Sequence, residues 1–458
     1  MLTSSGLSQL TRSFAGDVIR PGDPGYEAAR VIWNGMIDRH PALIVRPTST
    51  ADVVTAVKFA REQELLVAVR SGGHSIPGLS TCDDGIVIDL SRMRGAEVDP
   101  ARRIARVNGG ALLGELDEAA QKIGLVCPVG VVSHTGVAGL TLGGGMGRLQ
   151  RKYGLTVDSL HSVDLVTADG RQVRASADEN AELFWGVRGA GANFGIATSF
   201  EFRLHPLEGK ITHGVVIYPA RRARELAARF REIVDSGPDD LFASFGFELA
   251  STAEPAEVAG KPIAFVSVHH VGSPESAERD IAALHALGPA VIDTIRVKPY
   301  LTAQRMNDET MRWGYRFYMK SAFINSLPDE LIDRCVEHMP RVPSGVNGGY
   351  TVWACGRAIA RVPEEATAFS GRQAAFWMGS EILWKDEARD DECRTWGRVA
   401  MAESKPYESE GRYVNDVAEV GDDVTRSVYG DAKYQRLVAL KRAWDPGNFF
   451  RLNQNVRP

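Results

Sequence analysis

The chain has 458 residues, of which 44% are hydrophobic and 24% charged, an ordinary globular composition in a chain too long for a single core. A net charge of −5 and the lack of any basic run argue against nucleic acid or an anionic membrane as the main partner. The sequence contains no run of 18 apolar residues, so no membrane span is predicted. The five cysteines form no CxxC pair and the N-terminus lacks an apolar signal region, so we expect free thiols, no metal and a cytoplasmic location.

The first part of the chain alternates strands and helices. Short apolar strands are predicted at 42–46, 65–69 and 85–90, and Thr50 is the expected N-cap of a helix between the first two. The loop VRSGGHSIPGLS follows the second strand and places His74 behind Gly72 and Gly73. These glycines permit a positive φ and a close approach of the backbone to a partner. A core histidine needs neither glycine, so we expect a ligand to lie against this loop.

Glycine is concentrated in two further stretches. VGVVSHTGVAGLTLGGGMG at 129–147 is too rich in glycine for an ordinary helix, and RGAGANFG follows at 188–195. Neither has the spacing of a G-x-G-x-x-G fingerprint or of a P-loop, which disfavours a nicotinamide-binding Rossmann domain. Three glycine clusters could instead converge on one long ligand. A dinucleotide has the right size, and backbone N–H groups can cradle its pyrophosphate.

The remaining elements extend to the C-terminus. VDLVTADGRQVRAS predicts a hairpin with an Asp169-Gly170 turn, and ENAELFWGVRG predicts a helix. After residue 207 we expect a helix over ARRARELAARFREIVDS and strands at KPIAFVSVHHVG, TVWACGRAIARV and QAAFWMGSEILW. From Arg412 the pattern changes to RYVNDVAEV, a helix over 431–443 and WDPGNFFRLNQNV. This tail lacks a core of its own, so it should pack on an earlier domain.

Four stretches taken together resemble a known family. They are VRSGGHS, TGVAGLTLGGGMGRLQRKYGLTVD, LFWGVRGAGANFGIATSFEFRLHP and the terminal YVN…YQRLVALKRAWDPGNFFRLNQN. In this order they resemble the FAD-linked oxidases of the vanillyl-alcohol oxidase and p-cresol methylhydroxylase superfamily, and most of all the bacterial berberine-bridge-type members. The resemblance implies a two-domain α+β fold. Its parts are an N-terminal segment at 1–39, an FAD-binding domain at 40–207, a substrate domain with an antiparallel sheet at 208–411, and a C-terminal segment at 412–458 that packs on the FAD domain.

The resemblance also implies how FAD is held. The histidine of the RSGGH motif, here His74, is bonded in this family to the 8α-methyl group of the isoalloxazine. A second link through cysteine is not expected, because Val132 stands at that position and Cys127 lies five residues too early. The residues that match the other cofactor-binding positions are Arg70, Ser71, Gly72, Gly73, Ser75, Gly78, Leu79, Gly130, Val132, Thr135, Gly136, Gly139, Leu142, Gly143, Gly144, Gly145, Gly147, Tyr153, Gly195, Ile196, Asn415, Asn453 and Asn455.

Removal of a hydride from a substrate carbon also requires a base. Many relatives carry Y-x-N-Y near the C-terminus, with the second tyrosine as base. This chain has YVND, so Asp416 either acts as the base or shapes the pocket. Glu381 is the second candidate, because strand alternation puts it on the face of Trp377, where apolar surroundings would raise its pKa. A solvent-facing carboxylate is the alternative for both, and Tyr413 and Lys320 complete the catalytic candidates.

The expected function is FAD-dependent oxidation of an alcohol, sugar or amine-type carbon in a small-molecule substrate. Gly130 is small at a position where, in the family, a small residue accompanies reactivity with dioxygen. We therefore favour O2 as the electron acceptor and hydrogen peroxide as its product. A dehydrogenase with another acceptor, a redox-neutral flavin-bound cyclase or binding protein, and a nicotinamide-dependent enzyme are the alternatives. The sequence does not indicate the substrate or the oligomeric state.

Overall fold

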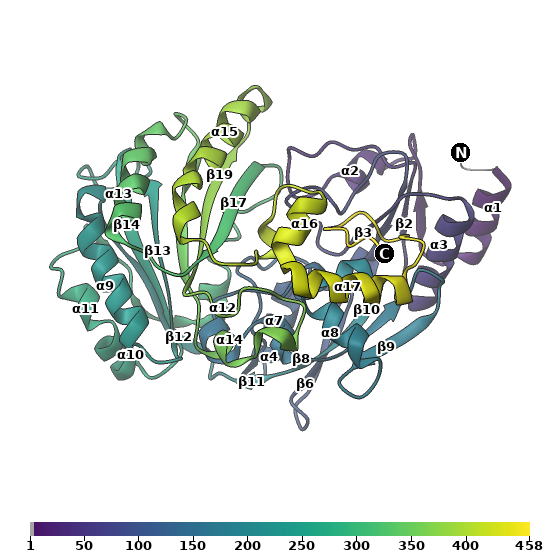
Figure 1. Cartoon of the computed structure of the whole chain (residues 1–458), viewed down its shortest axis with the longest axis horizontal. Helices are drawn as coiled ribbons and strands as arrows, with labels where there is room; N and C mark the ends of the chain where they lie inside the picture. The colour runs from purple at the N-terminus through teal and green to yellow at the C-terminus, as the bar shows by residue number, and fades with distance from the viewer. Residues whose placement is uncertain (1–3) are drawn as a thin grey trace.

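The computed structural model describes residues 4–458 and builds them around three β-sheets (Figure 1). In the first sheet, β2 (Leu43–Arg46), β4 (Ile86–Asp89) and β3 (Val67–Arg70) are parallel neighbours, and β1 (Asp17–Ile19) adds an antiparallel edge. These are the three predicted apolar strands. The connecting helix α3 (Thr50–Glu62) begins one residue earlier than expected, because its cap is Ser49, whose hydroxyl accepts the N–H of Asp52. Helices α1 (Ser4–Ser13) and α2 (Tyr26–Arg30) precede it.

The second sheet is antiparallel, and its central strand follows the glycine-rich segment at 188–195. Its order is β5 (Ala96–Asp99), β6 (Ile104–Asn108), β10 (Ile196–Arg203), β8 (Leu160–Val166) and β9 (Gln172–Ser176). The predicted hairpin is β8–β9, with Gly170 at φ +79° in its turn. The helices of this part are α4 (Leu113–Gln121), α5 (Val137–Leu142), α6 (Gln150–Tyr153), α7 (Thr156–Ser159) and α8 (Ala181–Ala190). A short ribbon pairs β7 (Leu125–Val126) with β11 (His205–Pro206).

The third sheet is the large antiparallel sheet expected after residue 207. Its order is β15 (Ile292–Asp293), β12 (Lys210–Pro219), β14 (Pro262–His270), β13 (Leu241–Leu249), β18 (Asn347–Ala354), β19 (Phe376–Trp384) and β17 (Arg316–Ile324), and β16 (Arg296–Pro299) also pairs with β12. The predicted strand TVWACGRAIARV ends early, at Ala354. Positive φ angles at Gly356 and Arg357 turn the chain there into α14 (Ala358–Arg361).

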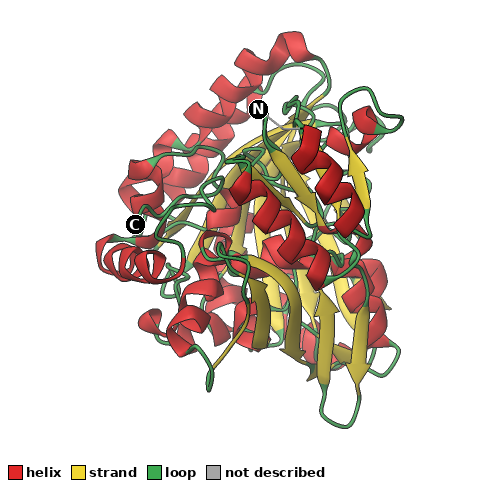
Figure 2. Ribbon diagram, turned by 90° about the vertical axis from the view of Figure 1, so that its right-hand side faces the viewer, coloured by secondary structure: helices red, strands yellow, loops and turns green. Residues whose placement is uncertain are grey.

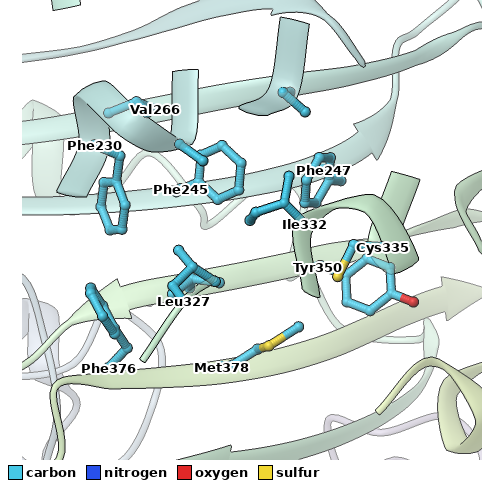
Figure 3. Close-up of a cluster of buried hydrophobic side chains, with 14 of the residues drawn as sticks. Phe230, Phe245, Phe247, Val266, Leu327, Ile332, Cys335, Tyr350, Phe376 and Met378 are labelled. Carbon is cyan, nitrogen blue, oxygen red and sulfur yellow. The ribbon is translucent and has the colours of Figure 1, made fainter. Parts of the chain in front are cut away.

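Helices cover only one face of this sheet. They are α9 (Ala223–Ser236), α10 (Pro274–Asp280), α11 (Ala282–His285), α13 (Asp329–His338) and α15 (Asp390–Ala400), with α12 (Tyr300–Gln304) at the end nearer the second sheet (Figure 1). Phe230 of α9 packs on Phe245 of β13 and Phe376 of β19, in a core that also includes Ile332 and Cys335 of α13 (Figure 3). Because side chains alternate along a strand, the residues between these core positions point to the opposite face. Figure 2 shows the molecule from the side opposite this helical layer, with the part that holds α1, α3 and β9 toward the viewer.

The C-terminal tail packs on the glycine-rich half of the molecule. Its helices α16 (Asp422–Tyr429) and α17 (Asp431–Trp444), yellow in Figure 1, lie beside α8. The Nζ of Lys441 is fully buried and donates to the carbonyl oxygens of Asn193 and Phe450, both at 2.8 Å, and to Asp445 at 2.7 Å. This network fixes the tail against the loop before β10. The domain limits at residues 39, 207 and 411 remain predictions.

The α+β fold class is confirmed. Over residues 4–458, no helix combines the length and apolar character needed to cross a bilayer. In the same range, no group of three or more His, Cys, Asp or Glu residues is arranged to hold a metal ion. All five cysteines are buried and free.

Candidate active site

A cavity of about 730 Å³ lies between the glycine-rich loops and the uncovered face of the third sheet. One wall comes from residues 71–80, 130–148 and 189–197, together with the tail at 450–454. The tail at 413–416 runs from this wall to the opposite one, where Asp416 lies beside Glu381. The opposite wall is formed by side chains of the sheet, among them Ser244, Glu248, Trp353, Trp377 and Glu381. Small-molecule and cofactor sites occupy cavities of roughly 300–1,000 Å³. The cavity is therefore of the right size for an organic ligand.

The glycines of the RSGGH motif bring two loops into contact. A Cβ added at Gly72 would lie 2.1 Å from the backbone nitrogen of Gly136, and one added at Gly136 would lie 2.2 Å from that of Gly72. Only glycine permits this approach. Gly73 has a φ of +70°, and the hydroxyl of Ser71 donates to the carbonyl of Gly109 at 2.8 Å. The motif thus joins the first sheet to the loop at 129–147 and presents its histidine at the junction.

His74 is held by two rings. It stacks on Trp33 at 4.8 Å between centroids, and its Nε2 lies 2.7 Å from Nδ1 of His134. Burial, and then the neighbouring His134, lower the pKa of His74 to about 3, so its imidazole is neutral near pH 7. Its Nδ1 makes no hydrogen bond to any described residue, and the side chain lines the cavity. A neutral imidazole with one free nitrogen is a competent nucleophile.

Asp416 and Glu381 meet in the cavity. Asp416 ends the 3₁₀ turn η8 (Val414–Asp416), and Glu381 projects from β19. Burial raises the pKa of Asp416 well above its ordinary value, and the nearby Glu381 carboxylate raises it further. The neighbouring Trp377 indole acts in the opposite direction and lowers this pKa. Burial and then Glu248 raise the pKa of Glu381 to about 7. Neighbouring carboxyl groups in such a site ionise in sequence, so one is available as a base near neutral pH.

The YVND segment is clamped to the glycine-rich loop. The hydroxyl of Tyr413 accepts from the N–H of Met146 at 3.1 Å and from Nδ2 of Asn415 at 2.9 Å. The same Nδ2 donates to the carbonyl of Leu140 at 3.0 Å. Burial and the charge of Asp416 raise the pKa of Tyr413, so this phenol stays neutral. Tyr413 and Asn415 thereby position Asp416.

Most of the residues expected at the site lie together in the wall of this cavity. They are Ser71, Gly72, Gly73, His74, Ser75, Leu79, Gly130, Val132, Thr135, Gly136, Gly139, Leu142, Gly143, Gly195, Ile196, Glu381, Tyr413, Asn415, Asp416 and Asn453.

Lys320 lies elsewhere. On β17 its neighbour Met319 faces the cavity, so Lys320 points to the other face, where its Nζ lies 3.8 Å from Glu419. Tyr153 also lies outside the cavity wall, since its hydroxyl donates to the carbonyl of Pro206 at 2.7 Å and its ring stacks on His205. We no longer consider Lys320 a catalytic candidate or Tyr153 a ligand of the cofactor.

The other expected residues outside the wall support it from behind. Arg70 donates to the carbonyl of Ala29 at 2.6 Å beneath the His74 loop, and Gly78 closes the turn of that loop. At Gly147 a Cβ would lie 1.9 Å from the carbonyl oxygen of Val129. Gly144 and Gly145 take positive φ angles. Asn455 is held in the tail, with an Oδ1 that has no hydrogen-bond partner.

Sequence reasoning missed three contributors. His134 contacts His74, Trp33 stacks on His74, and Glu248 adds a third carboxyl group to the cavity. His134 stands inside a glycine-rich stretch, which was a usable signal. Glu248 ends an apolar strand, FASFGFEL, and nothing in that run indicates a second carboxylate across the sheet.

The cavity walls fit FAD. Glycine backbone lines one side, and a Cβ added at Gly139 would meet nothing within 4 Å, so the backbone there faces open space. The buried Oδ1 of Asn453 lacks a partner while the side chain lines the cavity. Glycine-rich backbone offers N–H groups to a pyrophosphate, and His74 presents a free nitrogen. These features define an enzyme that binds a large cofactor on one wall and places carboxyl groups on the other.

Comparison with known proteins also indicates an enzyme that binds FAD. The family model for an FAD binding domain matches residues 41–176, and the model for berberine and berberine-like proteins matches residues 412–457. The curated (R)-6-hydroxynicotine oxidase of Paenarthrobacter nicotinovorans is 34% identical, with 97% of each chain covered.

Solved structures agree as well. A crystal structure of 6-hydroxy-D-nicotine oxidase from Arthrobacter nicotinovorans superposes with a TM-score of 0.88 at 31% identity, over 97% of this chain and 98% of that one. Berberine-bridge-enzyme-like protein 1 of Physcomitrella patens gives 0.87 at 25% identity, with 99% of both chains covered. The chain therefore belongs to the FAD-linked oxidoreductases of the berberine-bridge-enzyme-like family, and it is an FAD-dependent enzyme.

Proposed function

We propose that this enzyme is an oxidase that carries a single covalent FAD on His74, removes hydride from a small-molecule alcohol, sugar or amine carbon, and passes the electrons to O2. The observation that carries the proposal is the cavity itself, with His74 and glycine backbone on one wall and Asp416 and Glu381 on the other. The names of the relatives, which are hydroxynicotine oxidases, support an oxidase.

The residues divide the work between holding the cofactor and moving protons. Backbone around Gly136, Gly143 and Gly191, with Asn453, would hold FAD, and His74 would anchor it. When bound, FAD accepts the hydride and transfers two electrons to dioxygen. Asp416 would take the substrate's hydroxyl or amine proton as the hydride leaves. The hydrophobic side chains of Trp353 and Trp377 keep bulk water away from that carboxylate.

The contact with His134 supports Nδ1 of His74 as the nitrogen that bonds to the 8α-methyl carbon. Nε2 of His74 is occupied by His134, whereas Nδ1 is free. An imidazole that attacks through Nδ1 would carry its proton on Nε2 and would lose it when the bond forms. The methyl group would lose one C–H hydrogen in the same net change, and the two electrons released would pass through the flavin to O2. Nδ1 of His134, at 2.7 Å, is placed to accept that proton.

We expect the variant His134→Asn to attach FAD more slowly and less completely than wild type, because asparagine fills similar space without a basic nitrogen. The measurement is the flavin fluorescence of the protein band after denaturing electrophoresis, followed over time after FAD is added to protein purified without it. His205→Asn is a matched control, because His205 is a half-buried histidine outside the cavity wall. Equal attachment rates in His134→Asn and wild type would remove His134 from this role.

The oxidase proposal is tested by oxygen consumption. Air-saturated enzyme mixed with a reducing substrate should consume one O2 and release one H2O2 per substrate oxidised. A dehydrogenase would instead hold reduced flavin in air until an artificial acceptor such as a quinone is added. Reduced flavin that persists in air would therefore contradict the oxidase proposal and leave the FAD enzyme intact.

A further inference from the structure

Three carboxyl groups form a row in the cavity, two on the sheet wall and one on the tail segment beside it. Glu248 of β13 and Glu381 of β19 both pair with Gly349, on the strand between them, so their Cα atoms are two strand spacings, or about 10 Å, apart. Gly349 places no side chain between them and itself lines the cavity. Asp416 extends the row, since its carboxyl group is near enough to Glu381 for the two charges to interact. We call Glu248, Glu381 and Asp416 the acidic row.

No basic side chain balances the acidic row. None of its three members forms an ion pair within residues 4–458. The charges that act on them come from other carboxylates, namely Glu381 on Asp416, Glu248 on Glu381, and Glu254 on Glu248. Carboxylates withdrawn from water without a cation are costly, and a ligand cation removes that cost.

Among residues 4–458, Arg148 is the one arginine in the cavity wall, and it is bonded elsewhere. The Nη1 atom of Arg148 donates to the carbonyl oxygens of Gln304 at 3.2 Å and Val131 at 3.4 Å. The charge of Arg148 acts on His269, at the other end of β14 from the acidic row. No lysine lines the cavity in the part of the chain that the structure describes.

Aromatic rings lie beside the acidic row. The ring of Phe265 covers Gly246, where a Cβ would come within 2.5 Å of it, and the ring of Trp377 covers Gly379, where the distance would be 2.6 Å. These glycines precede Glu248 and Glu381 by two residues on the same face of their strands. Trp377 is 2% exposed and its Nε1 has no hydrogen-bond partner in the cavity wall. Aromatic faces attract organic cations, so these rings suit a cationic ligand.

We propose that the acidic row binds the positively charged nitrogen of an organic amine, so that an amine, rather than an alcohol or a sugar, is the substrate. The inference rests on the proposed oxidase function and specifies its substrate class. A hydroxyl group would leave the negative charges unpaired, whereas an ammonium group neutralises one and donates hydrogen bonds to the others. The aromatic rings and the size of the cavity favour an amine with an apolar or aromatic body.

The reaction balances for such a substrate. The bound ammonium gives one N–H proton to a carboxylate of the acidic row, which frees the nitrogen lone pair. The α-carbon then loses a hydride to FAD, a C=N double bond forms, and the product leaves as an iminium ion. Dioxygen takes up the two electrons and two protons and becomes hydrogen peroxide. Asp416 is the proton acceptor, and Glu248 binds the charge.

Binding without turnover tests the inference. The probes are benzyltrimethylammonium, a cation with no N–H proton to lose, and benzyl methyl ether, a neutral compound with the same aromatic body, each titrated into oxidised holoenzyme by calorimetry at pH 7.5. Wild type should bind the cation at least tenfold more tightly than the ether. The variant Glu248→Gln should lose at least tenfold in affinity for the cation and less than twofold for the ether. Glu257→Gln, at an exposed residue paired with Arg221, is the matched charge control and should behave as wild type.

A pH titration of wild type gives a second test that needs no variant. Glu381, whose pKa is about 7, faces Glu248 from β13 and Asp416 from η8, with Gly349 and Met319 opposite it on the flanking strands. Lowering the pH from 8 to 6 protonates Glu381 and should weaken binding of the cation but not of the ether.

Equal affinities for the two probes, absence of cation binding, or a Glu248→Gln variant that matches wild type would overturn the amine inference. None of these results would affect flavin attachment or oxygen consumption, which test the oxidase proposal separately.

Discussion

Replacement of Asp416 by asparagine is expected to slow reduction of the flavin by about 10²–10⁴-fold, the range that a positioned base contributes. Asparagine keeps the shape of the side chain and the contacts of Tyr413 and Asn415, but it cannot accept the substrate proton. The measurement is anaerobic rapid mixing with an oxidisable amine such as N-methylbenzylamine, with the flavin absorbance as the signal. The covalent flavin content should be unchanged, because His74 lies on the opposite wall.

The pH dependence separates Asp416 from its neighbour. A base must be ionised, and the pKa of Asp416 is raised by burial and by Glu381, so the reduction rate of wild type should rise as pH increases through this raised pKa. Glu381→Gln removes a negative charge, which lowers the pKa of Asp416 and moves the rising limb to lower pH while a high rate is retained. If Asp416→Asn reduces the flavin at the wild-type rate at every pH, Asp416 is not the base.

Replacement of His74 by alanine is expected to abolish covalent attachment of FAD. In wild type the yellow colour should remain with protein precipitated by acid, whereas in His74→Ala all of it should pass to the supernatant. Covalent attachment generally raises the redox potential of a flavin, so the variant loaded with free FAD should also show a lower potential and slower reduction. Potentials are read by equilibration with a reference dye of known potential, and His205→Ala serves as the control.

A His74→Ala variant whose flavin stays with the acid pellet would place the bond on another residue. Loss of all flavin from His74→Ala, even with FAD added, would show that the histidine is needed for binding itself. The contacts of Gly72 with Gly136 do not involve the imidazole, so we expect the cavity to form and to retain FAD without the bond.

The strands and the cofactor wall could be predicted because their signals are local. The apolar runs at β2, β3 and β4 and the Asp169-Gly170 hairpin depend on residues that are neighbours in sequence. The glycines near His74 also stood out and were attributed to the close approach of a ligand, whereas the contact that Gly72 requires is with another loop. They allow two loops to cross at Gly72 and Gly136, a contact between segments far apart in the chain that a single sequence cannot show.

The sheet wall was harder to predict because it depends on strand order and phase. Glu381 was expected to share a face with Trp377, and both line the cavity. Lys320 was expected among the catalytic candidates, whereas the phase of β17 points Met319 inward and Lys320 away. Glu248 becomes Glu381's partner only through the order β13–β18–β19, and that order follows from packing over the whole domain.

The measurement that tests the account most directly is mass analysis of the peptide that contains His74, after proteolysis of acid-denatured wild-type protein in the dark. We predict a yellow peptide covering residues 71–80 whose mass exceeds that of its sequence by one FAD less two hydrogens, with fragmentation placing the addition on His74. An unmodified peptide from protein whose cofactor is free in solution would contradict the covalent link. An unmodified peptide from protein that takes up no FAD would contradict the assignment of the cavity.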